Sequence, residues 1–281
     1  MKSFTKVFVL FSLLLVACQP STQKEASLPE EGTEAIPLEA HLPTGVHLQA
    51  LYQIPNLIEG QVTSHNEMRY LLYLPDGYWE DPDKLWPMIF FLHGAGDEEF
   101  DSTYVLSAGL PAVLQLGEQP EDFPFVVVSP QAFPGSAWWT DDTLAILNAL
   151  LGEVIETYRV DPDRVYLTGL SMGGYGSWLL ATAYPERFAA MVSVSGSGYR
   201  TNFIPAEETL CRLKDVPVWA IHGAQDMISA LETSKLFVSA LKITCGGEVV
   251  WTQYEDLGHG GTYERAYRDP AIYAWMLEHS R

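Results

Sequence analysis

The sequence predicts an α/β protein with a mainly parallel central sheet flanked by helices, folded as a single domain. Short runs rich in β-branched and aromatic residues alternate with longer stretches in which apolar residues recur every three or four positions. Residues 88–92 and 125–128 are apolar without interruption, as expected for strands that are buried on both faces. No internal repeat and no second domain is visible in the folded part of the chain.

The strands and helices are expected in alternating order. Strands are expected at residues 46–54, 68–74, 88–92, 125–128, 164–168, 190–195, 216–221 and 249–254. Helices are expected at residues 141–158, 172–184, 230–241 and 272–279. The first of these helices has Thr140 or Asp141 as its N-terminal cap, and Pro185 ends the second because proline cannot continue a helix.

Composition narrows the class of protein. The chain has 281 residues, of which 36 are acidic and 16 basic, so its formal net charge is −20. With 47% apolar and 19% charged residues, the composition is that of a globular protein. Such an acidic chain, without a basic cluster to neutralise phosphates, is not expected to bind nucleic acid. Three cysteines are too few for a disulfide scaffold.

The N-terminus has the pattern of a signal peptide. Lys2 and Lys6 precede or border the apolar residues 7–16, and this stretch is too short for a permanent membrane span. The sequence Leu-Val-Ala-Cys that ends at Cys18 resembles the lipobox of bacterial lipoproteins. This resemblance implies that residues 1–17 are removed and that Cys18 is lipidated and becomes the first mature residue. The alternative is an ordinary secretory signal with an incidental cysteine.

Residues 18–45 are expected to be a flexible tether between the lipid anchor and the catalytic domain at 46–281. They are polar, rich in Glu, Pro and Ser, and lack apolar periodicity. By the lipoprotein resemblance, Gln19 after the cysteine favours the outer membrane, if the sorting rules of enteric bacteria apply. The expected location is therefore the bacterial cell envelope.

A candidate nucleophile lies near the middle of the chain. Residues 169–173 read Gly-Leu-Ser-Met-Gly, a G-x-S-x-G pattern placed between an expected strand and an expected helix. In such a strand-turn-helix the serine adopts a strained backbone, and the glycines leave room for the close approach of strand and helix. Ser171 is therefore the candidate nucleophile. The alternative is a tight turn with an ordinary capping serine.

The segment around this motif carries a family resemblance. Residues 164–190, RVYLTGLSMGGYGSWLLATAYPERFAA, resemble the nucleophile segment of α/β-hydrolases of the carboxylesterase, dienelactone hydrolase and prolyl-oligopeptidase-like groups. The likeness extends from about Tyr70 to the C-terminus and is closest to secreted esterases related to polyhydroxybutyrate depolymerases and feruloyl esterases. It implies an α/β-hydrolase fold and a triad in the chain order Ser, Asp or Glu, His.

Few histidines downstream of Ser171 can serve as the base. His222 ends an expected strand and is expected to pack or to cap that turn, and His279 lies in the terminal helix, where a solvated side chain is the default. His259 lies in the glycine-rich stretch Leu-Gly-His-Gly-Gly after the strand at 249–254, which we expect to be a loop at the C-terminal edge of the sheet. His259 is therefore the candidate base.

Asp226 is the candidate acid, because it follows the strand at 216–221 and the resemblance places the triad acid in such a loop. Its role would be to hold the imidazole tautomer and to stabilise the imidazolium. Glu255 and Asp256 are rivals, but each shares the loop of His259 on a short tether. Asp215 precedes its strand and so lies at the wrong end of a parallel sheet.

A tetrahedral intermediate requires N–H donors for its oxyanion. Met172 follows the nucleophile and would supply one backbone N–H. The loop His-Gly-Ala-Gly at 93–96 would supply the second, and by the resemblance Ala95 is the donor. The alternative for these glycines is a simple tight turn.

Trp138 and Trp139 are candidate substrate-binding residues, because adjacent tryptophans after a strand offer a flat apolar surface to an acyl group, a phenolic ring or a sugar. The alternative is a tryptophan packed beneath the loop.

Residues 97–99 and Asp101 form an acidic cluster beside the expected oxyanion loop. This cluster is either a solvated surface or a pocket rim that disfavours anionic substrates.

Cys211 and Cys245 are candidates for a disulfide, since one precedes the strand at 216–221 and the other follows the helix at 230–241. Two free thiols are the alternative.

The expected function is a serine hydrolase that cleaves small or polymer-borne carboxylic esters through an acyl-enzyme, without metal or organic cofactor. The alternatives are a prolyl-oligopeptidase-like peptidase or amidase, and a non-catalytic glycan- or polymer-binding surface lipoprotein.

Overall fold

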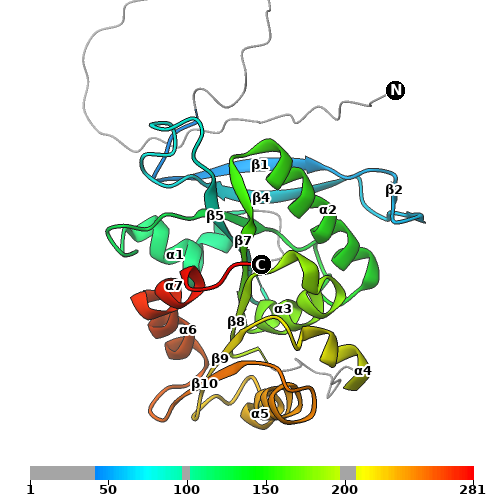
Figure 1. Ribbon diagram of the computed structural model, residues 1–281, viewed down its shortest axis with the longest axis vertical. Coiled ribbons are helices and arrows are strands. Elements are labelled where there is room, and N and C mark those ends of the chain that lie inside the picture. Colours follow the sequence, from blue (N-terminus) through cyan, green and yellow to red (C-terminus); the bar gives the residue numbers. More distant parts are fainter. Residues whose placement is uncertain (1–41, 97–101, 197–206) are drawn as a thin grey trace, which may run out of the picture.

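The computed structural model describes residues 42–96, 102–196 and 207–281. In this part of the chain, eight strands form one twisted sheet in the order β1-β4-β6-β5-β7-β8-β9-β10. The strands are β1 His47–Gln53, β4 Glu67–Tyr73, β5 Trp86–Leu92, β6 Val126–Pro130, β7 Val160–Leu170, β8 Ala190–Val194, β9 Val218–Gly223 and β10 Val249–Tyr254. Figure 1 shows the sheet running through the middle of the molecule with helices on both sides.

The sheet is antiparallel at one end and parallel elsewhere. β1 pairs with β4 and β4 pairs with β6 in antiparallel register. From β6 through β5, β7, β8 and β9 to β10, every pairing is parallel. The carboxyl ends of β7, β9 and β10 therefore lie along one edge of the sheet, where open α/β sheets bind ligands.

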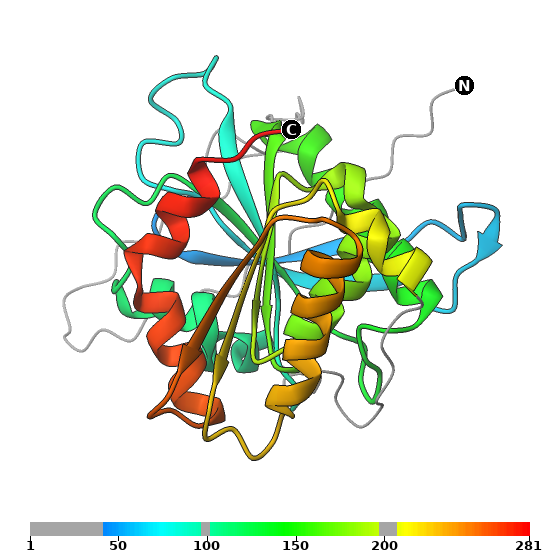
Figure 2. The same ribbon diagram turned by 60° about the horizontal axis from the view of Figure 1, so that its bottom comes forward.

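Helices cover both faces of the sheet. The described helices are α1 Gly109–Leu116, α2 Asp141–Thr157, α3 Met172–Ala183, α4 Glu207–Leu210, α5 Leu231–Ser239, α6 His259–Arg268 and α7 Pro270–Leu277. One apolar core lies between the sheet and α2, α3 and α5, and a second lies between the sheet and α1, α6 and α7. Figure 2 shows the two groups of helices on opposite sides of the strands.

The strand at β5 shows why the sheet needs both layers. Met88, Phe90 and Leu92 belong to the first core, whereas Ile89 and Phe91 belong to the second, and all five are fully buried. Because successive side chains of a strand point to opposite faces, an uninterrupted apolar run is stable only under two layers of helices.

Four features differ from the sequence expectations. A small hairpin, β2 Leu57–Ile58 with β3 Gln61–Val62, and the helices α1 and α4 were not expected. The loop after β10 is shorter than expected, covering residues 255–258, because α6 begins at His259 itself. The remaining expected strands and helices are present, the strand at 249–254 with the same ends as β10 and the others with shifted ends. Thr140 is the N-terminal cap of α2 and accepts from the backbone N–H of Thr143.

Residues 1–41, 97–101 and 197–206 lie outside the described part of the chain. The signal peptide, Cys18, most of the tether and the acidic cluster beside the expected oxyanion loop all fall in these segments. Within the described residues, no helix is long and apolar enough to cross a membrane.

Candidate active site

Ser171 occupies a sharp turn between β7 and α3. Its backbone angles are φ 53 and ψ −117, a left-handed conformation that side-chain-bearing residues rarely adopt. The turn is held by hydrogen bonds from Ser171 N to Val194 O at 2.9 Å and from Tyr175 N to Ser171 O at 3.0 Å. The strand, the turn and the helix have the geometry of a nucleophile elbow.

The two glycines of the motif are required by close packing. A Cβ on Gly169 would lie 2.4 Å from the carbonyl oxygen of Gly173. A Cβ on Gly173 would lie 1.9 Å from the carbonyl oxygen of Leu92, which ends β5. Both obstacles are backbone atoms, so no side-chain rotation can relieve them. The glycines therefore hold the elbow tightly against the loop that follows β5.

Asp226 and His259 meet at the same edge of the sheet as Ser171. Asp226 follows β9 and His259 follows the neighbouring strand β10. The carboxylate Oδ2 of Asp226 lies 2.7 Å from Nδ1 of His259, and the two side chains are 0% and 13% exposed. A carboxylate can only accept, so Nδ1 carries the proton and Nε2 is the bare nitrogen. That is the tautomer a general base requires.

Hydrogen bonds keep Asp226 ionised. Burial on its own would raise the pKa of this carboxyl. Donors from His222, His259 and the backbone N–H groups of Ser229 and Ile228 nevertheless hold the pKa of Asp226 well below its ordinary value. A negative charge is therefore fixed behind the His259 ring, where it can stabilise an imidazolium.

The rival residues lie elsewhere. Asp256 is solvent-facing and pairs with Arg265 at 3.1 Å. Asp215 is exposed before β9, at the opposite edge of the sheet. His279 is not solvated as expected, because its Nδ1 lies 2.7 Å from the carbonyl oxygen of Trp275 and its side chain is 17% exposed. His222 is buried, as its expected packing role implies, but it also touches Asp226, which sequence reasoning missed.

Among the described residues, no hydrogen bond joins Ser171 Oγ to His259. Ser171 is 6% exposed and follows β7, and the single strand β8 lies between β7 and β9. Catalytic hydrogen bonds of this kind are often long in the absence of substrate and tighten when it binds. The structure thus brings the three candidate residues to one edge, with the acid and the base already paired.

The loop after β5 is locked beside the nucleophile. His93 Nε2 accepts from Ala132 N at 3.0 Å, so its Nδ1 carries the proton and donates to Gly94 O at 2.7 Å. A Cβ on Gly94 would lie 3.6 Å from the Cβ of Ser171. Ala95 therefore follows a residue that packs directly against the nucleophile.

Trp138 does not have the role expected from the sequence. Its side chain is 0% exposed, its Nε1 donates to His93 O at 2.9 Å, and a Cβ on Gly176 would lie 2.4 Å from its own Cβ. It packs beneath the loop and braces His93, so it offers no surface to a substrate. Trp139 is 37% exposed, with its ring 6.0 Å from that of Tyr175.

Cys211 and Cys245 are joined by a disulfide, with their Cα atoms 4.9 Å apart. The bond links the segment before β9 to the segment after α5. It therefore lies toward the amino end of β9, away from the edge that carries Ser171, and ties α5 to the sheet.

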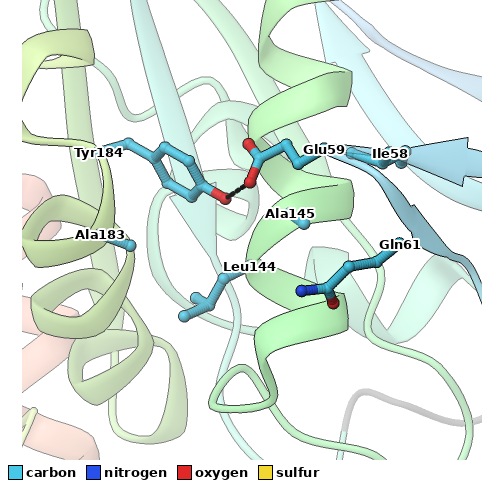
Figure 3. Close-up of a pocket in the computed structure, with 7 residues that line it drawn as sticks. All are labelled: Ile58, Glu59, Gln61, Leu144, Ala145, Ala183 and Tyr184. Carbon is cyan, nitrogen blue, oxygen red and sulfur yellow. Dashed lines mark hydrogen bonds between the residues drawn. The ribbon is translucent and has the colours of Figure 1, made fainter.

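A separate cavity of about 210 Å³ lies between the β2–β3 hairpin and the helices α2 and α3. Figure 3 shows Glu59 reaching across it to the hydroxyl of Tyr184, which donates to Glu59 Oε2 at 3.1 Å. The other carboxylate oxygen accepts from Asn148 at 3.2 Å. Both oxygens have partners and no triad residue lines the cavity, so these contacts attach the hairpin to the domain.

No group of three or more His, Cys, Asp or Glu side chains within the described ranges could hold a metal ion.

Comparison with known proteins agrees with this geometry. The family model Esterase matches residues 62–256, a span that includes Ser171 and Asp226. Feruloyl esterase C of Emericella nidulans is 29% identical over 185 residues, which are 63% of this chain and 62% of that protein. A bifunctional acetylxylan esterase/xylanase of Neocallimastix patriciarum is 30% identical over 106 residues, 36% of this chain and 15% of that protein. The chain thus spans less than two thirds of either relative.

Among solved structures, a thermostable esterase superimposes with a TM-score of 0.65 and 28% identity, covering 84% of this chain and 63% of that one. The sheet order, the elbow and the positions of the paired acid and base are those of the α/β-hydrolase fold. The family match covers more than half of the sequence, and the chain belongs to the Esterase family.

Proposed function

We propose that this protein is a serine hydrolase that cleaves carboxylic esters through an acyl-enzyme, with Ser171 as nucleophile, His259 as base and Asp226 as acid. The observation that carries the proposal is the strained elbow at Ser171 on the same sheet edge as a buried Asp226 bonded to His259 at 2.7 Å. Membership of the Esterase family supports the choice of ester over amide.

Acylation would begin when Nε2 of His259 removes the proton from Ser171 Oγ. The Oγ to carbon bond forms, and the carbonyl electron pair moves to oxygen. The backbone N–H groups of Met172 and Ala95 would donate to this oxyanion. When the carbonyl re-forms, the bond to the alcohol oxygen breaks, and the imidazolium protonates the leaving alcohol. Water then attacks the acyl-enzyme with the same proton transfers and releases the acid.

Asp226 would hold His259 in the required tautomer and balance the charge of the imidazolium. Its lowered pKa keeps it anionic, so it stays an acceptor and does not take up the proton itself. Trp139, which is partly exposed, would contact an apolar or aromatic part of the substrate.

The substrate would be a small or polymer-borne ester. The names of the two relatives refer to feruloyl esters and acetylxylan, so acetyl and feruloyl esters are the first substrates to compare.

We also propose that the protein is attached to the bacterial cell envelope, at the outer membrane, by lipid on Cys18. The lipobox-like pattern before Cys18 supports this location. A Cys18→Ala variant should lose metabolic labelling with a fatty acid and leave the membrane fraction.

Hydrolysis of p-nitrophenyl acetate by the purified protein tests the activity, with Ser171→Ala as the paired control. We expect turnover by the wild type and a loss of about 10⁴-fold or more in kcat for the variant. A folded wild type without turnover, or a variant as active as the wild type, would contradict the proposal.

A further inference from the structure

A second histidine, besides His259, contacts the candidate acid. His222 lies in β9, four residues before Asp226, and its side chain is 0% exposed. Its Nε2 lies 3.3 Å from Asp226 Oδ2, the same oxygen that bonds His259. One carboxylate oxygen therefore faces two imidazole rings, and the mechanism above uses only one of them.

The neighbours of His222 fix its tautomer. Nε2 faces the carboxylate of Asp226 and, at 3.2 Å, the carbonyl oxygen of Ser229. Both are acceptors only, so Nε2 must carry the ring proton. The bare Nδ1 then accepts from the hydroxyl of Ser234 in α5, at 2.8 Å. The His222 ring is therefore oriented with its Nε2–H between the carbonyl oxygen of Ser229 and Oδ2 of Asp226, and with its Nδ1 on Ser234.

With His222 included, each carboxylate oxygen of Asp226 faces two N–H groups. Oδ1 accepts from Ile228 N at 2.9 Å and from Ser229 N at 2.8 Å. Oδ2 accepts from His259 Nδ1 at 2.7 Å and lies 3.3 Å from His222 Nε2. Ser229 is itself anchored, because its Oγ donates to the carbonyl oxygen of Ser195 at 2.8 Å. An ionised carboxylate offers about four acceptor sites; here three accept hydrogen bonds and the fourth faces His222 Nε2.

We propose that Ser234 and His222 are a positioning pair that orients Asp226 toward His259 and keeps the triad proton on His259. The proposal rests on the proposed esterase function, since it assigns a role to residues behind the same triad. His222 acts through Asp226 and is a positioning residue.

Proton placement explains why a second donor matters. When His259 becomes an imidazolium, its Nδ1 proton lies between two groups that can both hold it. A donor from His222 lowers the proton affinity of Asp226 Oδ2, so the proton stays on His259 and the carboxylate keeps its charge. Without this donor, one side of a buried carboxylate oxygen loses its N–H neighbour, and the proton affinity of Asp226 rises.

Two amide substitutions separate this role from simple packing. The side-chain nitrogen of glutamine is as many bonds from Cα as Nε2 of histidine, so His222→Gln keeps a donor toward Asp226. Asparagine reaches only as far as Nδ1, so His222→Asn can serve Ser234 but not Asp226. Ser234→Ala removes the hydroxyl that holds Nδ1 of His222. His47→Asn is a matched control, because His47 lies in β1 and its hydrogen bond among the described residues goes to the carbonyl oxygen of Pro111, at 3.0 Å.

The test is steady-state hydrolysis of p-nitrophenyl acetate by the full chain, with melting temperatures of all variants. We expect His222→Asn to lower kcat by about 10- to 100-fold with KM within about twofold, the loss expected for one hydrogen bond to a charged group. His222→Gln should return kcat to within about threefold of wild type. Ser234→Ala should lower kcat by about 3- to 10-fold, and His47→Asn should leave it unchanged.

A spectroscopic readout follows the same bond. The low-field proton resonance of His259 Nδ1 should shift in His222→Asn and return in His222→Gln. Wild-type kcat in His222→Asn, or a glutamine variant as impaired as the asparagine variant, would overturn the positioning role. An inactive wild type would overturn the proposed function instead, and the proton resonance would then decide the positioning role on its own.

Discussion

Replacing Gly173 with alanine should damage both stability and catalysis. A Cβ at this position would lie 1.9 Å from the carbonyl oxygen of Leu92, 2.4 Å from its carbonyl carbon and 2.5 Å from the carbonyl oxygen of His93. All three are backbone atoms of the strand end and loop that carry the candidate oxyanion donor. The elbow and this loop must therefore move apart to accommodate one methyl group.

The size of the effect follows from these contacts. Overpacking a close-packed core costs about 1–3 kcal/mol, and a backbone clash this short belongs at the upper end of that range. For a domain of this size, about 3 kcal/mol corresponds to a fall of about 6–12 °C in melting temperature. Displacement of an oxyanion donor costs about 10²- to 10³-fold in kcat. Thermal unfolding and hydrolysis of p-nitrophenyl acetate measure the two effects.

Gly152 provides the matched control. It lies within α2, and a Cβ there would meet nothing within 4 Å. Gly152→Ala should therefore keep the wild-type activity and stabilise the protein by up to about 1 kcal/mol, the helix propensity gain of alanine over glycine. A Gly173→Ala variant with the melting temperature and kcat of the wild type would refute the reasoning.

Three further predictions concern other residues. Replacing Cys211 and Cys245 with serine should lower the free energy of unfolding in urea by about 4 kcal/mol, the chain-entropy value for a separation of 34 residues; an unchanged midpoint would contradict it. Because the folded pKa of Asp226 lies below its unfolded value of about 3.9, its stabilisation is complete above that pH and is lost as the pH falls toward the folded pKa. The urea stability gap between wild type and Asp226→Asn should thus narrow below about pH 4, and a constant gap would argue against it. Trp138→Phe should lower kcat by about 2- to 10-fold, because it removes the hydrogen bond from Trp138 Nε1 to His93 O. Trp139→Ala should raise KM for aromatic esters with little change in melting temperature. Identical kinetics for the two variants would disprove that Trp138 braces the loop while Trp139 contacts substrate.

The sequence was most informative where local pattern and tertiary environment agree. The strand at 249–254 was predicted with the ends that β10 has, because its β-branched and aromatic residues are bounded by polar and glycine-rich segments. The elbow at Ser171 was located for a similar reason. Its glycines are dictated by contacts within the strand-turn-helix unit and with the adjacent strand end.

Other features depend on contacts between segments distant in sequence. Gly260 and Gly261 indicated a loop, but α6 forms through them because Ala266 and Tyr267 pack fully buried in the second core. The β2–β3 hairpin has strands of two residues, too short for any periodic signal. Its local sequence signal is Gly60, a residue that readily takes the positive φ of a tight hairpin turn. Glu59 also has a positive φ there, which its residue type does not predict.

In the candidate site, too, some features depend on contacts between distant segments. The local sequence does not distinguish Trp138 from Trp139. Trp138 is the buried one because it packs against Gly176 of α3 and donates to the carbonyl oxygen of His93. The contact of His222 with Asp226 depends on the bend after β9, which returns the aspartate over the strand end. Its one sequence signal is the short spacing between these residues.

Covalent labelling tests the central claim most directly, namely that Ser171 is a nucleophile activated by His259. A fluorophosphonate probe reacts when an activated serine oxygen bonds to phosphorus and fluoride leaves. Intact mass and peptide mapping should show one adduct per wild-type chain, on Ser171, and no adduct in Ser171→Ala or His259→Ala at the same exposure. A folded wild type that stays unlabelled, or an adduct on another residue, would contradict the account.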